Sequence, residues 1–112
     1  MKRLIKQSNT STEVKSAYEA KGFQYEETGM ASDGFTLLID DVSMLVTSQK
    51  TYESPTDLDR PIEVSIDYGC DLSENVELQF NSSTEFLNKF NEILKEYKIK
   101  AEEYNETILG DL

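Results

Sequence analysis

The chain has 112 residues, a formal net charge of −11, a single cysteine and no histidine. This length predicts one domain spanning residues 1–112, and 38% hydrophobic residues in regular patterns predict a folded domain with one modest core. The lone cysteine excludes an intrachain disulfide, and the lack of histidine removes the commonest general base and the commonest metal ligand.

The sequence contains no motif for a catalytic centre, a cofactor or a metal ion. Cys70 has no histidine to activate it, and one cysteine without histidine cannot build the usual zinc sites. The five glycines are scattered singly, so no glycine-rich phosphate loop is present. The acids in residues 57–59 and 67–71 do not have the spacing of a calcium-binding loop. We therefore expect a protein that is not an enzyme and that holds no cofactor or metal.

The sequence also bears on the compartment. No stretch approaches the run of about 20 apolar residues that a membrane span requires. The basic start MKRLIKQSNTST has no apolar segment of the secretory kind behind it. We therefore expect a cytoplasmic protein with no membrane partner.

The first predicted elements are a short strand or an arm at residues 1–7 and a helix of about three turns over residues 11–22. Ser11 or Thr10 can cap the start of this helix, and Gly22 supplies its C-terminal cap. The residues that share its apolar face are Val14, Ala17 and Tyr18.

Alternating apolar residues predict a strand in residues 23–30 and a hairpin in residues 35–50. Asp40 and Asp41 would form the tight connection of the hairpin, although neither is the glycine that best supplies a positive φ. One continuous bent strand is the alternative. Residues 49–61 contain both prolines and no periodicity, and they form the longest predicted loop.

Two more strands are predicted in the stretch RPIEVSIDYGCDLSENVELQF, residues 60–80. In each of them, apolar residues alternate with polar or acidic ones, as in a sheet that has one buried face and one wet face. The apolar set is Ile62, Val64, Ile66 and Tyr68 in the first strand and Val76, Leu78 and Phe80 in the second.

The C-terminal residues 81–112 predict one long helix, capped by Ser82 with Glu85 three residues on and ended by Gly110. At about 1.5 Å per residue it would be about 40 Å long, longer than the sheet it could cover. Its apolar stripe consists of Phe86, Phe90, Ile93, Tyr97, Ala101, Tyr104 and Ile108.

Together these elements predict a two-layer α+β domain. An antiparallel sheet of about four to six strands would carry the short N-terminal helix and the long C-terminal helix on one face. The end of the stripe would run past the sheet edge, which suggests a homodimer formed through Ala101, Tyr104, Ile108 and Leu109. The alternative is a helix break near residues 98–100, with the tail folding back on the same domain.

The acidic residues are concentrated in the centre of the chain. Residues 23–85 carry fourteen acids and two bases, a net charge of −12. A solvated, solubilising face is one explanation. A binding surface is the other, because strands disfavour Asp and Glu, and such an imbalance causes self-repulsion. The candidate binding residues are Glu63, Asp67, Glu77, Asp40, Asp41, Glu53, Asp57, Asp59, Asp71, Glu74 and the loop residue Tyr52, with Glu26, Glu27 and Asp33 extending the field.

Strand geometry sharpens the binding hypothesis. Glu63 and Asp67 would lie on the same side of one strand, about 13 Å apart at about 3.3 Å per residue. Glu77 would lie on a neighbouring strand if the two pair. Carboxylates fixed in such an array can stand in for phosphates, so the expected partner is a basic protein surface of a nucleic-acid-binding enzyme or ribonucleoprotein. Direct nucleic-acid binding is not expected from so acidic a surface.

In size, charge and architecture, this short, acidic, histidine-free α+β chain resembles the small inhibitors carried by phages and mobile elements. These include anti-CRISPR and anti-restriction proteins, several of which mimic nucleic acids. The resemblance implies a host nuclease or its guide-RNA complex as the target and steric blocking as the action. The alternative is a small dimeric accessory protein that assembles through its C-terminal helix.

Overall fold

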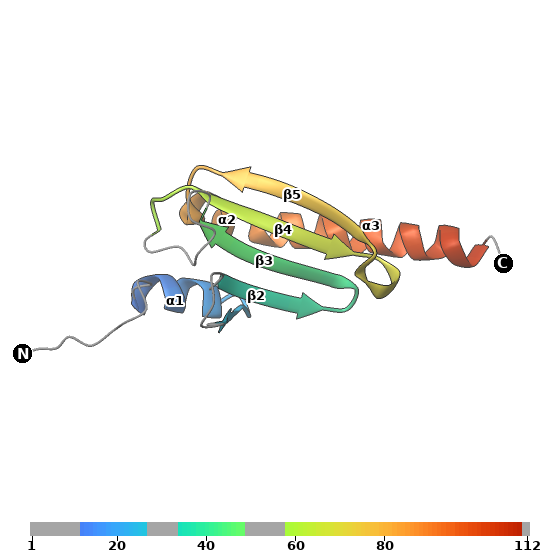
Figure 1. Ribbon diagram of the computed structural model, residues 1–112, viewed down its shortest axis with the longest axis horizontal. Coiled ribbons are helices and arrows are strands. Elements are labelled where there is room, and N and C mark those ends of the chain that lie inside the picture. Colours follow the sequence, from blue (N-terminus) through green and yellow to red (C-terminus); the bar gives the residue numbers. More distant parts are fainter. Residues whose placement is uncertain (1–11, 27–33, 49–57, 111–112) are drawn as a thin grey trace, which may run out of the picture.

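Five consecutive strands form one antiparallel sheet in the order β1-β2-β3-β4-β5, and helices cover one of its faces (Figure 1). The computed structural model describes residues 12–26, 34–48 and 58–110, and for residues 108–110 it describes the backbone alone. The strands are β1 (Gln24–Glu26), β2 (Gly34–Ile39), β3 (Val42–Ser48), β4 (Ile62–Tyr68) and β5 (Glu74–Phe80). The helices are α1 (Thr12–Glu19), α2 (Ser83–Asn88) and α3 (Phe90–Gly110), and a 3₁₀ turn, η1 (Cys70–Leu72), joins β4 to β5.

This arrangement confirms the predicted two-layer α+β fold. The predicted strand or arm at residues 1–7 and the caps at Thr10 and Ser11 lie outside the described residues. None of the helices in the described part of the chain is long and apolar enough to cross a membrane.

The helix α1 forms where two large apolar side chains one turn apart face the sheet. Val14 and Tyr18 are fully buried, because residues four apart lie on the same side of a helix. The helix ends at Glu19, and Gly22 supplies the predicted C-terminal cap: it takes a φ of 98° and donates its N–H to the carbonyl of Glu19 at 2.9 Å.

The strands β2 and β3 form a hairpin, so the alternative of one bent strand is wrong. Ile39 pairs with Val42, and Asp40 and Asp41 are the two residues of the turn. Asp40 takes a φ of 51°, a conformation that aspartate tolerates better than most residues with a side chain. Lys98 of α3 lies 3.6 Å from the Asp40 carboxylate and ties the turn to the helix layer.

The inner face of the sheet and the C-terminal stripe build the core. Alternation along β2, β3 and β4 buries one residue in two, and burying each such side chain contributes about 1.5–3 kcal/mol. The predicted helical stripe packs on this face from Phe86 to Ala101. The buried strand residues are Phe35, Leu37, Val42, Met44, Val46, Ile62, Val64 and Ile66.

The C-terminal helix is broken once, at Lys89, and it is continuous through residues 98–100, where the alternative placed a break. Its start is as predicted, because Ser82 Oγ accepts the N–H of Glu85 at 3.1 Å. At the break, Lys89 donates its N–H to the carbonyl of Phe86 at 3.0 Å, a tightened turn. Phe86 and Phe90, on either side of the break, are both buried in the aromatic core.

The later part of α3 closes one end of the sheet. Asn105 accepts the N–H of Cys70 at 2.6 Å and donates to the carboxylate of Asp41 at 2.8 Å, so it joins the β4–β5 loop to the β2–β3 turn. The Tyr104 ring lies against Gly69, and its hydroxyl accepts a hydrogen bond from Ser73 at 3.0 Å. The final turns of α3 extend beyond the end of the sheet (Figure 1).

A buried tyrosine joins α1 to α2 through the core. The Tyr18 ring stacks on Phe35 with centroids 4.4 Å apart and meets Phe23 edge to face. Its hydroxyl donates to Ser83 Oγ at 2.6 Å, and both residues are fully buried. Burial raises the pKa of the Tyr18 phenol, partly offset by the hydrogen bond to Ser83.

We expect Tyr18→Phe and Ser83→Ala each to lower the free energy of unfolding by about 1–3 kcal/mol, because each leaves the other buried hydroxyl without its partner. The double variant should lose less than the two single losses added, by about 1 kcal/mol. Urea unfolding of the four proteins measures this coupling. Simple additivity would show that the hydrogen bond contributes nothing.

A second stability test concerns Gly69, which takes a φ of 92° and a ψ of 178°. A Cβ built there would lie 2.6 Å from the Tyr104 ring. Gly69→Ala should therefore destabilise the domain by about 2–4 kcal/mol, from backbone strain and a steric clash together. Cys70→Ala, in the same loop, is the control and should change stability by about 0.5 kcal/mol or less. Equal effects in thermal unfolding would contradict this account.

Candidate functional site: the outer face of the sheet

The candidate site is the sheet face that the described helices leave open. The antiparallel register sets its side chains in rows across the strands, and Thr, Ser, Asn and Gln fill most positions. One row runs from Gln24 through Thr36, Leu45 and Ser65 to Glu77, and two flanking rows contain Thr47, Glu63 and Gln79, and Leu38, Ser43, Asp67 and Asn75.

Three acids on this face form what we call the acidic triangle: Glu63, Asp67 and Glu77. Glu63 and Asp67 lie on β4 on either side of Ser65, and Ser65 pairs directly with Glu77 of β5. Glu77 is therefore the diagonal neighbour of both, and such neighbours are about 7–8 Å apart. The structure thus brings these three predicted residues together. Glu26 adds a fourth acid near the other edge, on β1.

No lysine or arginine of the described residues forms an ion pair with these four acids. The ion pairs found lie elsewhere: Lys89 with Glu85, Lys98 with Asp40, and Lys100 with Glu96. Asp67 is instead held by a neutral partner.

Asn75 fixes Asp67 in place on the outer face. Its side-chain nitrogen donates to the Asp67 carboxylate at 2.7 Å and to Ser65 Oγ at 3.1 Å. An amide donor holds the carboxylate without cancelling its charge, so the triangle keeps its full negative field.

Two leucines on the same face were not among the predicted site residues. Leu38 is 68% exposed and Leu45 is 37% exposed. Leu45 lies opposite Thr36, two residues from Leu38, so the leucines are diagonal neighbours. The signal was present in the sequence, because both leucines occupy the polar phase of their strands.

A shallow depression of about 310 Å³ adjoins Leu38 near the β1 edge. Its lining includes both Leu38 and the carboxylate-bearing Glu26. The outer face therefore combines an apolar area over β2 and β3 with negative charge on both sides of it.

The other predicted acids are scattered. Asp40 and Asp41 lie at the β2–β3 turn and hold α3 and the β4–β5 loop, so both have structural contacts. Asp71 is in η1, and Glu74 begins β5 opposite Tyr68, on the inner side of the pleat. Asp59 is exposed in the segment before β4, while Tyr52, Glu53 and Asp57 lie outside the described residues.

The residues predicted to form a dimer are partly used inside the domain. Ala101 is only 3% exposed, and Tyr104 is half-buried against Gly69. These two therefore do not belong to an uncovered apolar stripe beyond the sheet edge. The side chains of Ile108 and Leu109 lie outside the described residues.

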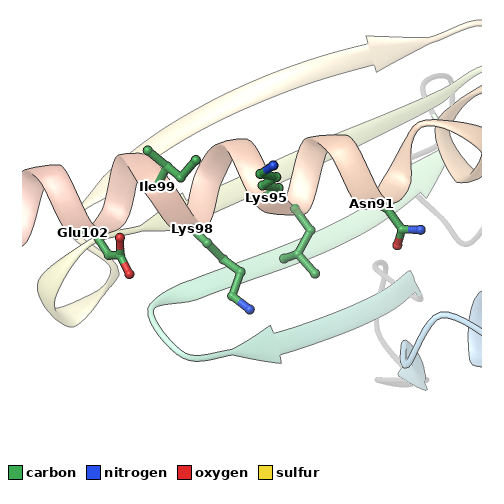
Figure 2. A pocket seen from close by; sticks show the side chains of 6 residues that line it. Asn91, Lys95, Lys98, Ile99 and Glu102 are labelled. Carbon is green, nitrogen blue, oxygen red and sulfur yellow. The ribbon is translucent and has the colours of Figure 1, made fainter.

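The open side of α3 offers a different surface, with charges of both signs. A depression of about 320 Å³ there is lined by Asn91, Leu94, Lys95, Lys98, Ile99 and Glu102. Figure 2 shows Ile99 and Lys98, adjacent on the helix, projecting in different directions. Its lining carries two lysines and one glutamate, and Lys98 pairs with Asp40, so this surface lacks the uniform negative charge of the outer sheet face.

Mutual repulsion within the acidic triangle should lower stability. Glu77→Gln should raise the free energy of unfolding by a few tenths of a kcal/mol, and Glu77→Lys by about 0.5 kcal/mol, because cross-strand opposite charges attract. Both gains should shrink in high salt. Urea unfolding at low and high salt measures them, and a lysine variant less stable than the glutamine variant at low salt would contradict the repulsion.

Within the described part of the chain, no three His, Cys, Asp or Glu residues are grouped so that they could hold a metal ion. Comparison with known proteins adds no assignment. No protein-family model matches the chain, and no curated protein or solved structure was found to be similar to it. The argument for function therefore rests on the outer face itself.

Proposed function

We propose that this protein is a non-enzymatic inhibitor that binds the basic nucleic-acid-binding surface of a host nuclease, or of its guide-RNA complex. It acts in the cytoplasm through nucleic-acid mimicry, as do several of the phage inhibitors that it resembles in character. The observation that carries the proposal is the outer sheet face, with four acids, two exposed leucines and no base among its described residues.

A face of this composition is costly for a protein that only needs to be soluble. Threonine or lysine would suit the strands better than Asp and Glu, and mixed charges would avoid repulsion. Exposed leucines add nothing to solubility. Residues that reduce stability without a structural role are typical of binding surfaces.

A nucleic-acid-binding protein presents the complementary surface, because it meets phosphates with lysine and arginine. Each carboxylate of the acidic triangle can accept charge-assisted hydrogen bonds from such a side chain. The apolar stems of the same side chains can cover Leu38 and Leu45 while their charged ends reach the acids. A partner held in this way has its basic groups occupied, and nucleic acid is excluded.

The alternative function, a dimeric accessory protein assembled through the C-terminal helix, has less support. Two of its four interface residues, Ala101 and Tyr104, contact the same chain. Truncating the chain after Lys100 would remove the proposed dimer interface. It would also remove Asn105, which joins two loops, so a loss of dimer could not be separated from a loss of fold. Sedimentation of the full chain tests the dimer directly.

The proposal predicts that reversing Glu63, Asp67 and Glu77 to lysine weakens partner binding by about a hundredfold or more while the fold is kept. The wild-type protein, immobilised at low salt in bacterial lysate, should capture one nucleic-acid-handling protein that a salt gradient releases. Mass spectrometry identifies that protein, and added DNA or RNA should displace it.

The matched control reverses three exposed acids of the helix layer, Glu19, Glu103 and Glu106. Both variants change the net charge from −11 by six units, so a general charge effect would act equally on them. Capture should survive in the control and fail in the face variant. Equal capture by the two variants, or affinity that does not change with salt, would sink the proposal.

A further inference from the structure

The strand β5 is a long, open edge of the sheet. It pairs with β4 at all seven positions without a bulge, and no strand of the described chain pairs with its other side. The opposite edge, β1, has only three residues. Proteins usually protect an edge with a short strand, a proline, a lysine or a bulge, because its outward N–H and C=O groups can pair with another chain. The sequence of β5, ENVELQF, has no proline, lysine or bulge, and its only charged residues are the acids Glu74 and Glu77.

The two sides of β5 differ in chemistry. On the inner side, Val76 and Leu78 are half-buried and pack against the core, so part of their apolar surface stays open at the edge. On the outer side, Asn75, Glu77 and Gln79 are exposed. A strand added here would place every second side chain beside the apolar row and the others beside Glu77.

We propose that β5 accepts an extended segment of a partner protein, by strand addition, in which apolar residues alternate with lysine or arginine. This inference rests on the proposed function and names the contact through which it begins. The basic side chains would lie opposite Glu77, with Glu63 and Asp67 one strand further in. Main-chain hydrogen bonds supply affinity in this mode, and the alternating side chains supply specificity.

Charge selects this occupant over a second copy of the chain. The β5 of another copy would bring two more acids, Glu74 and Glu77, and no base. Like charges on paired strands are destabilising, whereas a basic segment turns the same acids into attractive cross-strand partners. The acids of β5 thus protect the edge against self-pairing and leave it open to a basic strand.

The test uses the full chain and a synthetic peptide of about eight residues, matching the length of an average strand, in which valine alternates with lysine or arginine. Both peptide ends are blocked. The peptide should bind in calorimetry and slow amide hydrogen exchange along β5. A peptide of the same sequence, N-methylated at alternate residues, cannot complete the main-chain hydrogen bonds. It should bind at least about tenfold more weakly.

Two further comparisons separate charge from backbone pairing. A peptide with glutamate in place of the basic residues should not bind, and the substitution Glu77→Lys should weaken binding of the basic peptide.

Equal binding of the N-methylated peptide, or slowed exchange in other strands but not in β5, would overturn strand addition while leaving the acidic face as a binding surface. No binding of the basic peptide would also overturn strand addition, and a dimer of the protein alone that protects β5 would show that a second copy occupies the edge. Failure of the proposed function shows separately, as equal lysate capture by the two triple variants.

Discussion

The unbroken register of five antiparallel strands is the constraint on which the rest of this structure depends. Side chains alternate strictly along each strand, so a slip of one residue would exchange the buried face for the exposed one. The register that buries Ile62, Val64 and Ile66 also sets Glu63 and Asp67 outward and places Glu77 between them. Core and acidic triangle are therefore two results of one arrangement. The burial energy of the core holds Glu77 near two like charges, although they repel it.

The helix layer is held by side-chain hydrogen bonds at both ends of the sheet. The Tyr18–Ser83 hydrogen bond joins α1 to α2, and Asn105 joins two loops at the far end of the sheet. Lysines of the described helices lie in this layer, where three of them pair with nearby acids. The sheet is thereby supported from behind while its outer face stays free of compensating charge. A preformed surface of this kind loses little conformational entropy when it binds, which favours affinity.

Much of this could be predicted from the sequence, because alternation and helical spacing report directly on burial. The strands, the apolar stripe and the Ser82 cap follow from local patterns. The break at Lys89 does not, because it depends on how Phe86 and Phe90 meet an aromatic cluster drawn from distant segments. The packing of Tyr104 on Gly69 is likewise a long-range contact that no local sequence period reports.

For the site, the sequence placed Glu63 and Asp67 on one side of a strand, but the pairing of β4 with β5 was needed to bring Glu77 beside them. The turn acids Asp40 and Asp41 were grouped with them by charge alone, and their contacts with the helix layer separate them from the acidic triangle.

The most direct test of the central claim is carboxyl labelling of the protein, free and bound to its captured partner, read by mass spectrometry. It reports on each acid separately and needs no substitution. The account predicts that Glu63, Asp67 and Glu77 lose their reactivity in the complex, while Glu103 and Glu106 of α3 stay as reactive as in the free protein. Protection confined to the acids of α3, with the outer sheet face still labelled, would contradict it and would make the C-terminal helix the interface.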